Sequence, residues 1–188
     1  MKKAFKYRIY PNKAQRALFQ ATFGCCRFVY NKTLDIRKTA YAMDKTQLSE
    51  FDLIKKIKPL KEEFPWLRDV PAVCLPQAVG DMNDAFRDFF KSGKGYPKFK
   101  TKHRSRKSCR FPGQSCAVLQ DISRLKLPKL GLVKYKKDRE FIGTLRPIVI
   151  TQESNGKYYA SCLVDTGVEA PNPKPVEAST TVGIDLGL

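Results

Sequence analysis

The chain has 188 residues, and its 36 Lys and Arg residues outnumber its 18 Asp and Glu residues, which gives a formal net charge of +18. This length allows one good hydrophobic core or two small ones. No apolar run approaches the roughly 18 to 20 residues that cross a bilayer, which excludes a helical membrane span, and the first residues lack a signal-peptide core. So large a positive charge indicates a polyanionic partner, with nucleic acid first and an anionic membrane surface second. We therefore expect a cytoplasmic protein that binds nucleic acid and has no membrane partner.

The cysteine pattern does not indicate a metal site. The chain has one histidine, His103, and no C-x-x-C pair, and its six cysteines lie at positions 25, 26, 74, 109, 116 and 162. Zinc sites usually need such pairs or a Cys/His cluster. We expect no zinc site, and thiols that are reduced and mostly buried.

The first element that the sequence predicts is a half-buried strand over residues 3–10. Its residues alternate, with Phe5, Tyr7 and Ile9 on one face. The other face carries Lys6, Arg8 and Tyr10, so the strand has a basic outer side.

Helices are predicted next. Pro11 and the N-cap residue Asn12 predict a helix from about residue 13 to 23, which Gly24 ends, and a second helix over residues 25–43. Two short helices joined near a glycine are typical of a helix-turn-helix, but also of a plain helical hairpin. A third helix is predicted over residues 49–60, with a weak capping box from Ser49 and Asp52, and a fourth from about 71–75 to Phe90.

A basic segment follows. No acidic residue occurs from 89 to 120, and Tyr96, Phe99 and Phe111 are interleaved with lysines and arginines. Basic groups on an extended arm can follow a phosphate backbone, while the aromatic residues either stack on bases or hold the arm to its own domain. The alternative interpretation is a solvated run of charge.

The rest of the chain is predicted to be strands, over residues 117–119, 124–127, 132–135, 148–152 and 158–164, with a tight hairpin at Asn155-Gly156. Short strands at this spacing indicate a small β-barrel, in which the first strand finds its partners. The predicted fold class is thus α+β: a small barrel interrupted by an inserted helical domain. A Pro-containing linker follows over 166–181.

The last stretch, residues 182–188, is apolar except for one carboxylate, Asp185, between Gly183 and Gly187. A carboxylate in an apolar strand is costly to bury unless a cation meets it, so Asp185 is the candidate ligand for magnesium. The alternative is that Asp185 merely ends a strand at a turn. A two-metal site needs several carboxylates, so we expect a truncated protein or a fragment.

Six motifs in this order resemble the N-terminal half of the TnpB/OrfB proteins of insertion sequences: KYRIYPNKAQ (6–15), RFVYN (27–31), AFRDFF (85–90), YPKF (96–99), LKLPKLG (125–131) and GIDLG (183–187). The resemblance implies an RNA-guided DNA endonuclease related to type V CRISPR effectors, with guide RNA and double-stranded target DNA as partners.

The resemblance also implies a domain plan. Residues 1–11 and 95–165 would form a discontinuous, OB-like wedge domain, and 12–94 the inserted recognition domain, helix-turn-helix-like at 12–43. Residues 182–188 would start a truncated RNase H-like RuvC nuclease domain. Asp185 falls at the family's first catalytic carboxylate, which binds Mg²⁺. The family's other acidic ligands and its zinc element lie downstream, so we expect no firmly held metal here and no cleavage by this chain alone.

The candidate nucleic-acid-binding residues come from the basic segment, the outer face of the first strand, and the motifs and strands above. Pro76 before Gln77 departs from the family pattern, since many relatives have a polar helix position near the DNA there, so we expect recognition of the flanking motif to be altered. The set is Lys6, Arg8, Tyr10, Gln15, Arg27, Asn31, Gln77, Lys94, Lys98, Lys100, Lys102, Arg104, Arg106, Lys107, Arg110, Lys126, Lys129 and Lys134. A second hypothesis is a non-catalytic helix-turn-helix DNA-binding regulator or transposase accessory protein.

Overall fold

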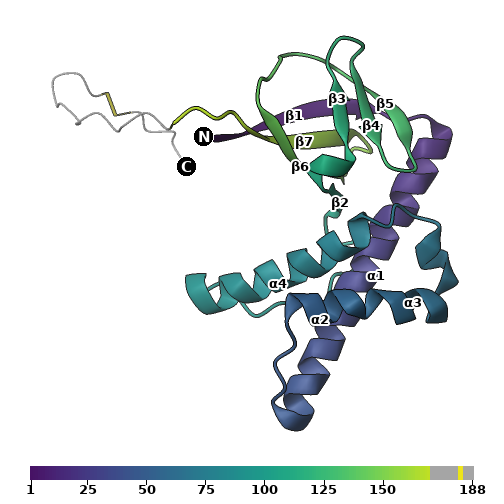
Figure 1. Cartoon of the computed structure of the whole chain (residues 1–188), viewed down its shortest axis with the longest axis vertical. Coiled ribbons are helices and arrows are strands. Elements are labelled where there is room, and N and C mark those ends of the chain that lie inside the picture. The colour runs from purple at the N-terminus through teal and green to yellow at the C-terminus, as the bar shows by residue number, and fades with distance from the viewer. Residues whose placement is uncertain (170–181, 184–188) are drawn as a thin grey trace.

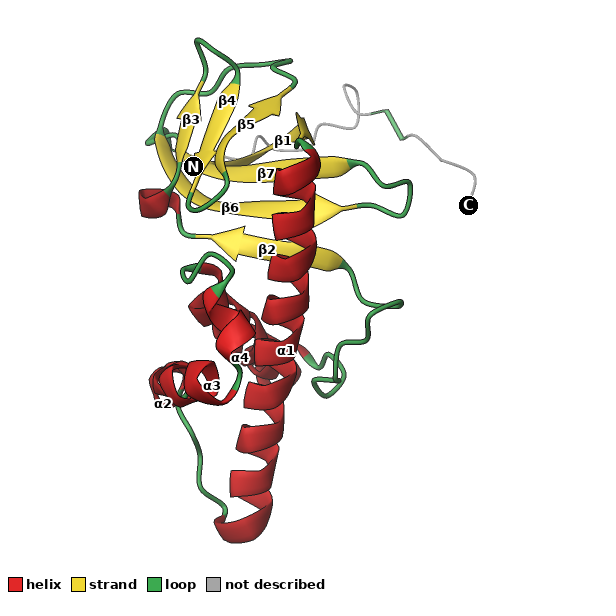
Figure 2. Cartoon of the chain, turned by 90° about the vertical axis from the view of Figure 1, so that its right-hand side faces the viewer, coloured by secondary structure: helices red, strands yellow, loops and turns green. Residues whose placement is uncertain are grey.

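The computed structural model describes residues 1–169 and 182–183. A curved sheet forms one end of the molecule and four α-helices form the other (Figure 1). The long helix α1 starts beside the sheet and continues into the helical part (Figure 2). Most of the expected linker, and Asp185 with its strand, lie outside the described residues.

Strand β1 (Lys2–Tyr10) has the predicted alternation, with Tyr7 and Ile9 buried and Lys6, Arg8 and Tyr10 exposed. Helix α1 (Lys13–Asp44) then begins with a capping box in which Asn12 and Gln15 bond each other's backbone amides. The box satisfies two of the free N–H groups at the helix start.

The break predicted at Gly24 is wrong, because α1 is one helix of 32 residues. Glycine costs about 1 kcal/mol relative to alanine inside a helix. Burial outweighs that cost, since Phe19, Phe23, Cys26 and Val29 lie on both sides of Gly24 and are all buried in the same core. The helix ends at Lys45, which has the left-handed φ of 61°.

Helices α2 (Glu50–Lys55) and α3 (Ile57–Glu63) replace the single third helix that we predicted, and the Ser49–Asp52 capping box is present. A short 3-10 turn, η1 (Pro65–Arg68), leads to α4 (Cys74–Ser92). The apolar side of α4 is buried at Val79, Met82 and Phe86, as its spacing predicts, but the prediction that Phe90 belongs to the core is wrong, because Phe90 is 73% exposed.

Seven strands form one antiparallel sheet in the order β2-β6-β7-β1-β5-β4-β3. Strand β1 pairs with β7 along eight residues and with β5 at Ile9 and Tyr10, so the first strand does find its partners in the C-terminal region. The other strands are β2 (Lys107–Phe111), β3 (Ala117–Leu119), β4 (Arg124–Leu127), β5 (Gly131–Tyr135), β6 (Thr144–Gln152) and β7 (Tyr158–Asp165), with a short 3-10 turn η2 (Gly113–Ser115).

The sheet does not close into the predicted barrel among the described residues, because β2 and β3 are left as its two edges. Strand β3 has only three residues, and α1 and α4 lie against β2. Strand β2 therefore packs against helices and does not pair with β3, as closure of the barrel would require.

The basic segment is less extended than predicted. Helix α4 continues to Ser92, and β2 takes up 107–111 as a sheet strand. Phe111 is fully buried opposite Ile148, whereas Tyr96 and Phe99 are 44% and 48% exposed. The segment that remains outside regular structure is 93–106. None of the helices in the described part of the chain is both long and apolar enough to cross a membrane.

Candidate nucleic-acid interface

One face of the sheet is basic. Directly paired residues share a face, and Tyr10 pairs with Lys134, which pairs in turn with Arg124 on β4. Since side chains alternate along a strand, Lys6 and Arg8 lie on this face too. The Arg8 guanidinium carbon is 5.0 Å from the centre of the Tyr10 ring. We call this surface, with Lys126 two residues beyond Arg124, the basic sheet face.

The pairing of β1, β5 and β4 brings the residues of the basic sheet face together from three strands. One of them was not predicted from the sequence. Arg124 was not a candidate, although it is two residues from Lys126 in a predicted strand and so belongs to the same face. The alternation within residues 124–127 was the signal that could have found it.

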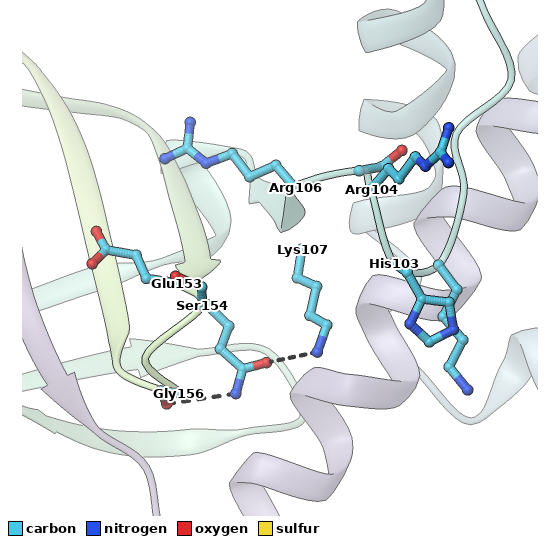
Figure 3. A pocket seen from close by; sticks show the side chains of 10 residues that line it. His103, Arg104, Arg106, Lys107, Glu153, Ser154 and Gly156 are labelled. Atoms are coloured by element: carbon cyan, nitrogen blue, oxygen red, sulfur yellow. Dashed lines mark hydrogen bonds between the residues drawn. The ribbon is translucent and has the colours of Figure 1, made fainter.

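A second basic surface surrounds a hollow of about 630 Å³ between the loop before β2 and the β6–β7 hairpin (Figure 3). We call residues 98–106, together with Lys107 at the start of β2, the basic loop. On the hairpin side, the hollow is lined by Gln152, Glu153, Ser154 and Gly156. The Lys107 ammonium donates to Gln152 Oε1 (3.3 Å), and so joins the loop to the hairpin. The loop contributes Lys102, His103, Arg104, Ser105, Arg106 and Lys107.

The hollow carries a net positive charge. Glu153 is the one carboxylate among the described residues that line it, and its Oε1 is 2.8 Å from the Lys6 ammonium. The ion pair neutralises Glu153 and joins the hollow to Lys6, which belongs to the basic sheet face. Within the described chain, Lys102, Arg104 and Arg106 are in no ion pair. Their charge is therefore available to a ligand.

The basic loop is fastened to α1 through Asn31. The Asn31 amide nitrogen donates to the Lys100 carbonyl (2.9 Å), and the Lys100 backbone N–H donates to Asn31 Oδ1 (2.8 Å). The Lys100 ammonium is 3.8 Å from the centre of the Tyr30 ring. Burial lowers the pKa of Lys100, and the nearby Asp81 carboxylate works in the opposite direction. Both candidates thus serve to hold the loop, and their polar groups are engaged within the chain.

Arg110 is held in the same way. Its guanidinium forms a close ion pair with Asp81 on α4 (2.5 Å) and lies 3.9 Å from Asp84. Burial raises the pKa of Asp81, and Arg110 and Lys100 partly offset that effect. Arg110 therefore compensates a half-buried carboxylate between α4 and β2.

Removing Arg110 should destabilise the fold. Arg110→Met leaves Asp81 half-buried without its closest cation, and we expect a loss of about 1 to 3 kcal/mol after allowing for solvent screening. For a chain of this size that lowers Tm by roughly 3 to 10 °C. The matched control is Arg87→Met, which breaks an exposed i,i+3 pair with Asp84 and should cost about 0.5 kcal/mol or less. Equal losses in thermal denaturation would contradict the role given to Arg110.

Two further candidates bond to backbone carbonyls. Gln15 Nε2 donates to the carbonyls of Leu130 and Leu132, each at 3.0 Å, and so ties the start of α1 to the turn between β4 and β5. The Lys129 ammonium donates to the Arg68 carbonyl (2.6 Å). These contacts link the helical part to the sheet.

The remaining candidates are dispersed. Lys94 pairs with Asp88 at 2.7 Å. Arg27 is half-buried on α1 and lines a small depression beside the basic loop, while Gln77 is half-buried on α4. Asp185 lies outside the described residues.

The part of the chain that the structure describes holds all six cysteines and the histidine, His103. There, no group of three or more His, Cys, Asp or Glu side chains is arranged to hold a metal ion. The six cysteines are free thiols, of which five are buried and Cys116 is half-buried, as the sequence predicted. Burial raises the pKa of Cys25 to about 11 and that of Cys162 to about 12. These thiols therefore stay protonated at neutral pH.

Two adjoining cationic surfaces on a fold of mixed helix and sheet are typical of proteins that bind nucleic acid. Comparisons with known proteins agree. Residues 1–46 match the OrfB family model of IS605-type elements, described as a helix-turn-helix domain. In this structure those residues form β1 and one continuous helix.

Three relatives narrow the class to a family. The chain is 29% identical over 188 residues to "Putative RNA-guided DNA endonuclease InsQ" of Escherichia coli K12, covering 98% of this chain and 45% of that protein. It is 29% identical over 193 residues to "Putative RNA-guided DNA endonuclease" of Streptomyces pristinaespiralis, covering 100% and 46%. It is 34% identical over 114 residues to "Virulence protein VsdF" of Salmonella dublin, covering 55% and 96%. The chain belongs to the TnpB/OrfB family, and it spans a little under half the length of the first two relatives.

Proposed function

We propose that residues 1–188 are the nucleic-acid-binding portion of a transposon-encoded, RNA-guided DNA endonuclease. The observation that carries this proposal is the hollow beside the basic loop, where Lys102, Arg104, Arg106 and Lys107 surround a space. Among the described residues that line it, the one carboxylate, Glu153, is neutralised by Lys6. Cations in this arrangement suit a phosphate backbone, because each one that meets a phosphate releases condensed counterions. The ligands are a guide RNA and the DNA flanking its target.

The two basic surfaces extend the same track. The ion pair joins Glu153 of the hollow to Lys6 of the basic sheet face, so a backbone leaving the hollow can continue past Arg8 and Lys134. Contacts of this kind position a nucleic acid without reading its sequence. Sequence would then be read by base pairing with the guide.

The domain plan that the family resemblance implies puts nucleic-acid binding and DNA cleavage in different domains. We assign β1 with β2–β7 to the family's OB-like wedge domain and residues 12–94 to its recognition domain. Residues 166–181 are the linker, and 182–188 begin the RuvC-like nuclease domain. Asp185 would be its first Mg²⁺ ligand, with the remaining ligands supplied downstream. Residues 1–188 on their own are therefore expected to bind without cutting.

A second candidate function is a duplex-DNA-binding regulator, which the helix-turn-helix description of the matching family model favours. Residues 13–44 are one helix, so no separate recognition helix follows a turn there. A preference for structured RNA over duplex DNA of equal length supports the first function, and the opposite preference supports the second.

The proposal predicts a steep salt response. With about six to eight phosphate contacts, affinity for a structured RNA should fall by roughly 10³ to 10⁵ between 50 and 200 mM salt. Fluorescence anisotropy of a labelled RNA hairpin, titrated with the chain at several salt concentrations, measures this slope. An affinity that does not change with salt concentration would mean that the cations do not contact phosphates, and would contradict the proposal.

A further inference from the structure

A groove rich in aromatic side chains lies between the second half of α1 and the end of α4. Its volume is about 420 Å³, within the roughly 300 to 1,000 Å³ that is typical of small-molecule sites. Phe90 is 73% exposed and Tyr96 is 44% exposed. We call it the aromatic groove, and its main residues are Arg37, Lys38, Phe86, Phe89, Phe90 and Tyr96.

The rings are fixed by contacts with one another. Phe89 meets Phe90 edge-on at 5.0 Å between ring centres, and Tyr96 meets Phe86 and Phe89 edge-on at 5.4 and 5.3 Å. Phe86 is buried and supports the others. The exposed ring of Phe90 is thus held in place, which lowers the entropy lost when a ligand stacks on it.

The polar atoms of the groove are cationic or neutral. The Arg37 guanidinium carbon is 4.4 Å from the centre of the Phe86 ring, and its Nη1 donates to Asn83 Oδ1 at 2.9 Å. The Lys38 ammonium is 5.2 Å from the ring of Phe99. No acidic side chain is among the described residues that line the groove. The groove therefore pairs flat apolar faces with fixed positive charge.

We infer that the aromatic groove is a subsite for an unpaired base of single-stranded nucleic acid. This inference rests on the proposed function. The base stacks on Phe90 and Tyr96, and the adjoining phosphate lies near Lys38. Stacking on an aromatic ring with a neighbouring cation is how single strands are bound without sequence preference.

Charge and continuity favour this occupant over an apolar peptide. A peptide needs no cations, whereas a nucleotide uses both the rings and Lys38. The groove also continues into the basic loop, since the Lys38 ammonium lies over the rings of both Tyr96 and Phe99. In the sequence, Lys98 stands between these two aromatic residues. One strand can then run from the groove along the loop to the hollow.

The test compares two probes of equal length and phosphate number, an oligouridine and its abasic analogue, by fluorescence anisotropy. We expect Phe90→Ala to weaken binding of the oligouridine by roughly 5-fold to 100-fold, and binding of the abasic probe by less than about twofold. Phe51→Ala is the matched control, because Phe51 is another exposed ring (65%) with a lysine over it, outside the groove. It should change neither affinity.

Two conservative variants separate a base from a peptide as the occupant. Phe90→Trp keeps a flat π face and should retain oligouridine affinity, whereas Phe90→Leu keeps only the apolar character and should lose it. Equal binding by the Leu variant overturns the inference in favour of an apolar ligand. If the unaltered chain binds both probes equally with a steep salt response, the subsite is wrong and the proposed function stands. If it binds neither probe but binds the RNA hairpin, the subsite alone is wrong, and if it binds none of the three, both are wrong.

Discussion

Changing four exposed cations of the basic loop to glutamine should reduce affinity for structured RNA by roughly 10² to 10³ at 100 mM salt, and lower the salt slope by about 3 to 4. These side chains are exposed and make no ion pair with other described residues, so their loss removes phosphate contacts without removing packing. Lys100 is left in place because it holds the loop to Tyr30. The substitutions are Lys98→Gln, Lys102→Gln, Arg104→Gln and Arg106→Gln.

The control removes the same number of positive charges from the segment that contains α2 and α3, with Lys55, Lys56, Lys58 and Lys61 changed to glutamine. Exposed charges separated by more than about 8 to 10 Å are largely screened at this ionic strength, so RNA affinity should change by less than about threefold. Melting temperatures of both variants should stay near that of the unaltered chain. If both variants lose affinity equally, only net charge matters and the basic loop is no specific surface.

Asp185 carries the second large prediction. In a protein where residues 1–188 are followed by the rest of the family's nuclease domain, Asp185→Asn should lower Mg²⁺-dependent DNA cleavage by at least about 10³-fold. Its RNA affinity should stay within about twofold, because one carboxylate contributes little to phosphate contacts. Guided cleavage of a labelled duplex and anisotropy with the guide RNA measure the two effects separately.

Asp165→Asn is the companion control, because Asp165 is a partly exposed aspartate at the end of β7 that pairs with Arg146 at 3.1 Å. Its replacement should leave cleavage unchanged. Undiminished cleavage by the Asp185 variant would remove that residue from the catalytic site. Robust cutting by residues 1–188 alone would contradict the proposal that further ligands come from downstream.

Local patterns predicted much of the fold. The alternation of Phe5, Tyr7 and Ile9 fixed both the strand and its buried face, and the apolar stripe on α4 fixed that helix. These elements were predictable because their own residues decide which side is buried. The predicted break at Gly24 failed because the burial of Phe23 and Cys26 depends on partners elsewhere in the chain.

The site was harder to predict, because its roles depend on contacts between distant residues. Asn31 and Lys100 are 69 residues apart in sequence, yet they bond each other and hold the loop. Arg110 looked like one more cation in a basic run until the structure paired it with Asp81. Composition can find a basic segment, but only tertiary structure separates the cations that face solvent from those that compensate buried groups.

The most direct test of the central claim is photo-crosslinking of residues 1–188 to a 4-thiouridine-labelled RNA hairpin, with crosslinked peptides located by mass spectrometry. Our account predicts crosslinks within residues 96–107 and on the basic sheet face at β1, and their loss at high salt. Crosslinks confined to α2 and α3, with none in 96–107, would contradict it.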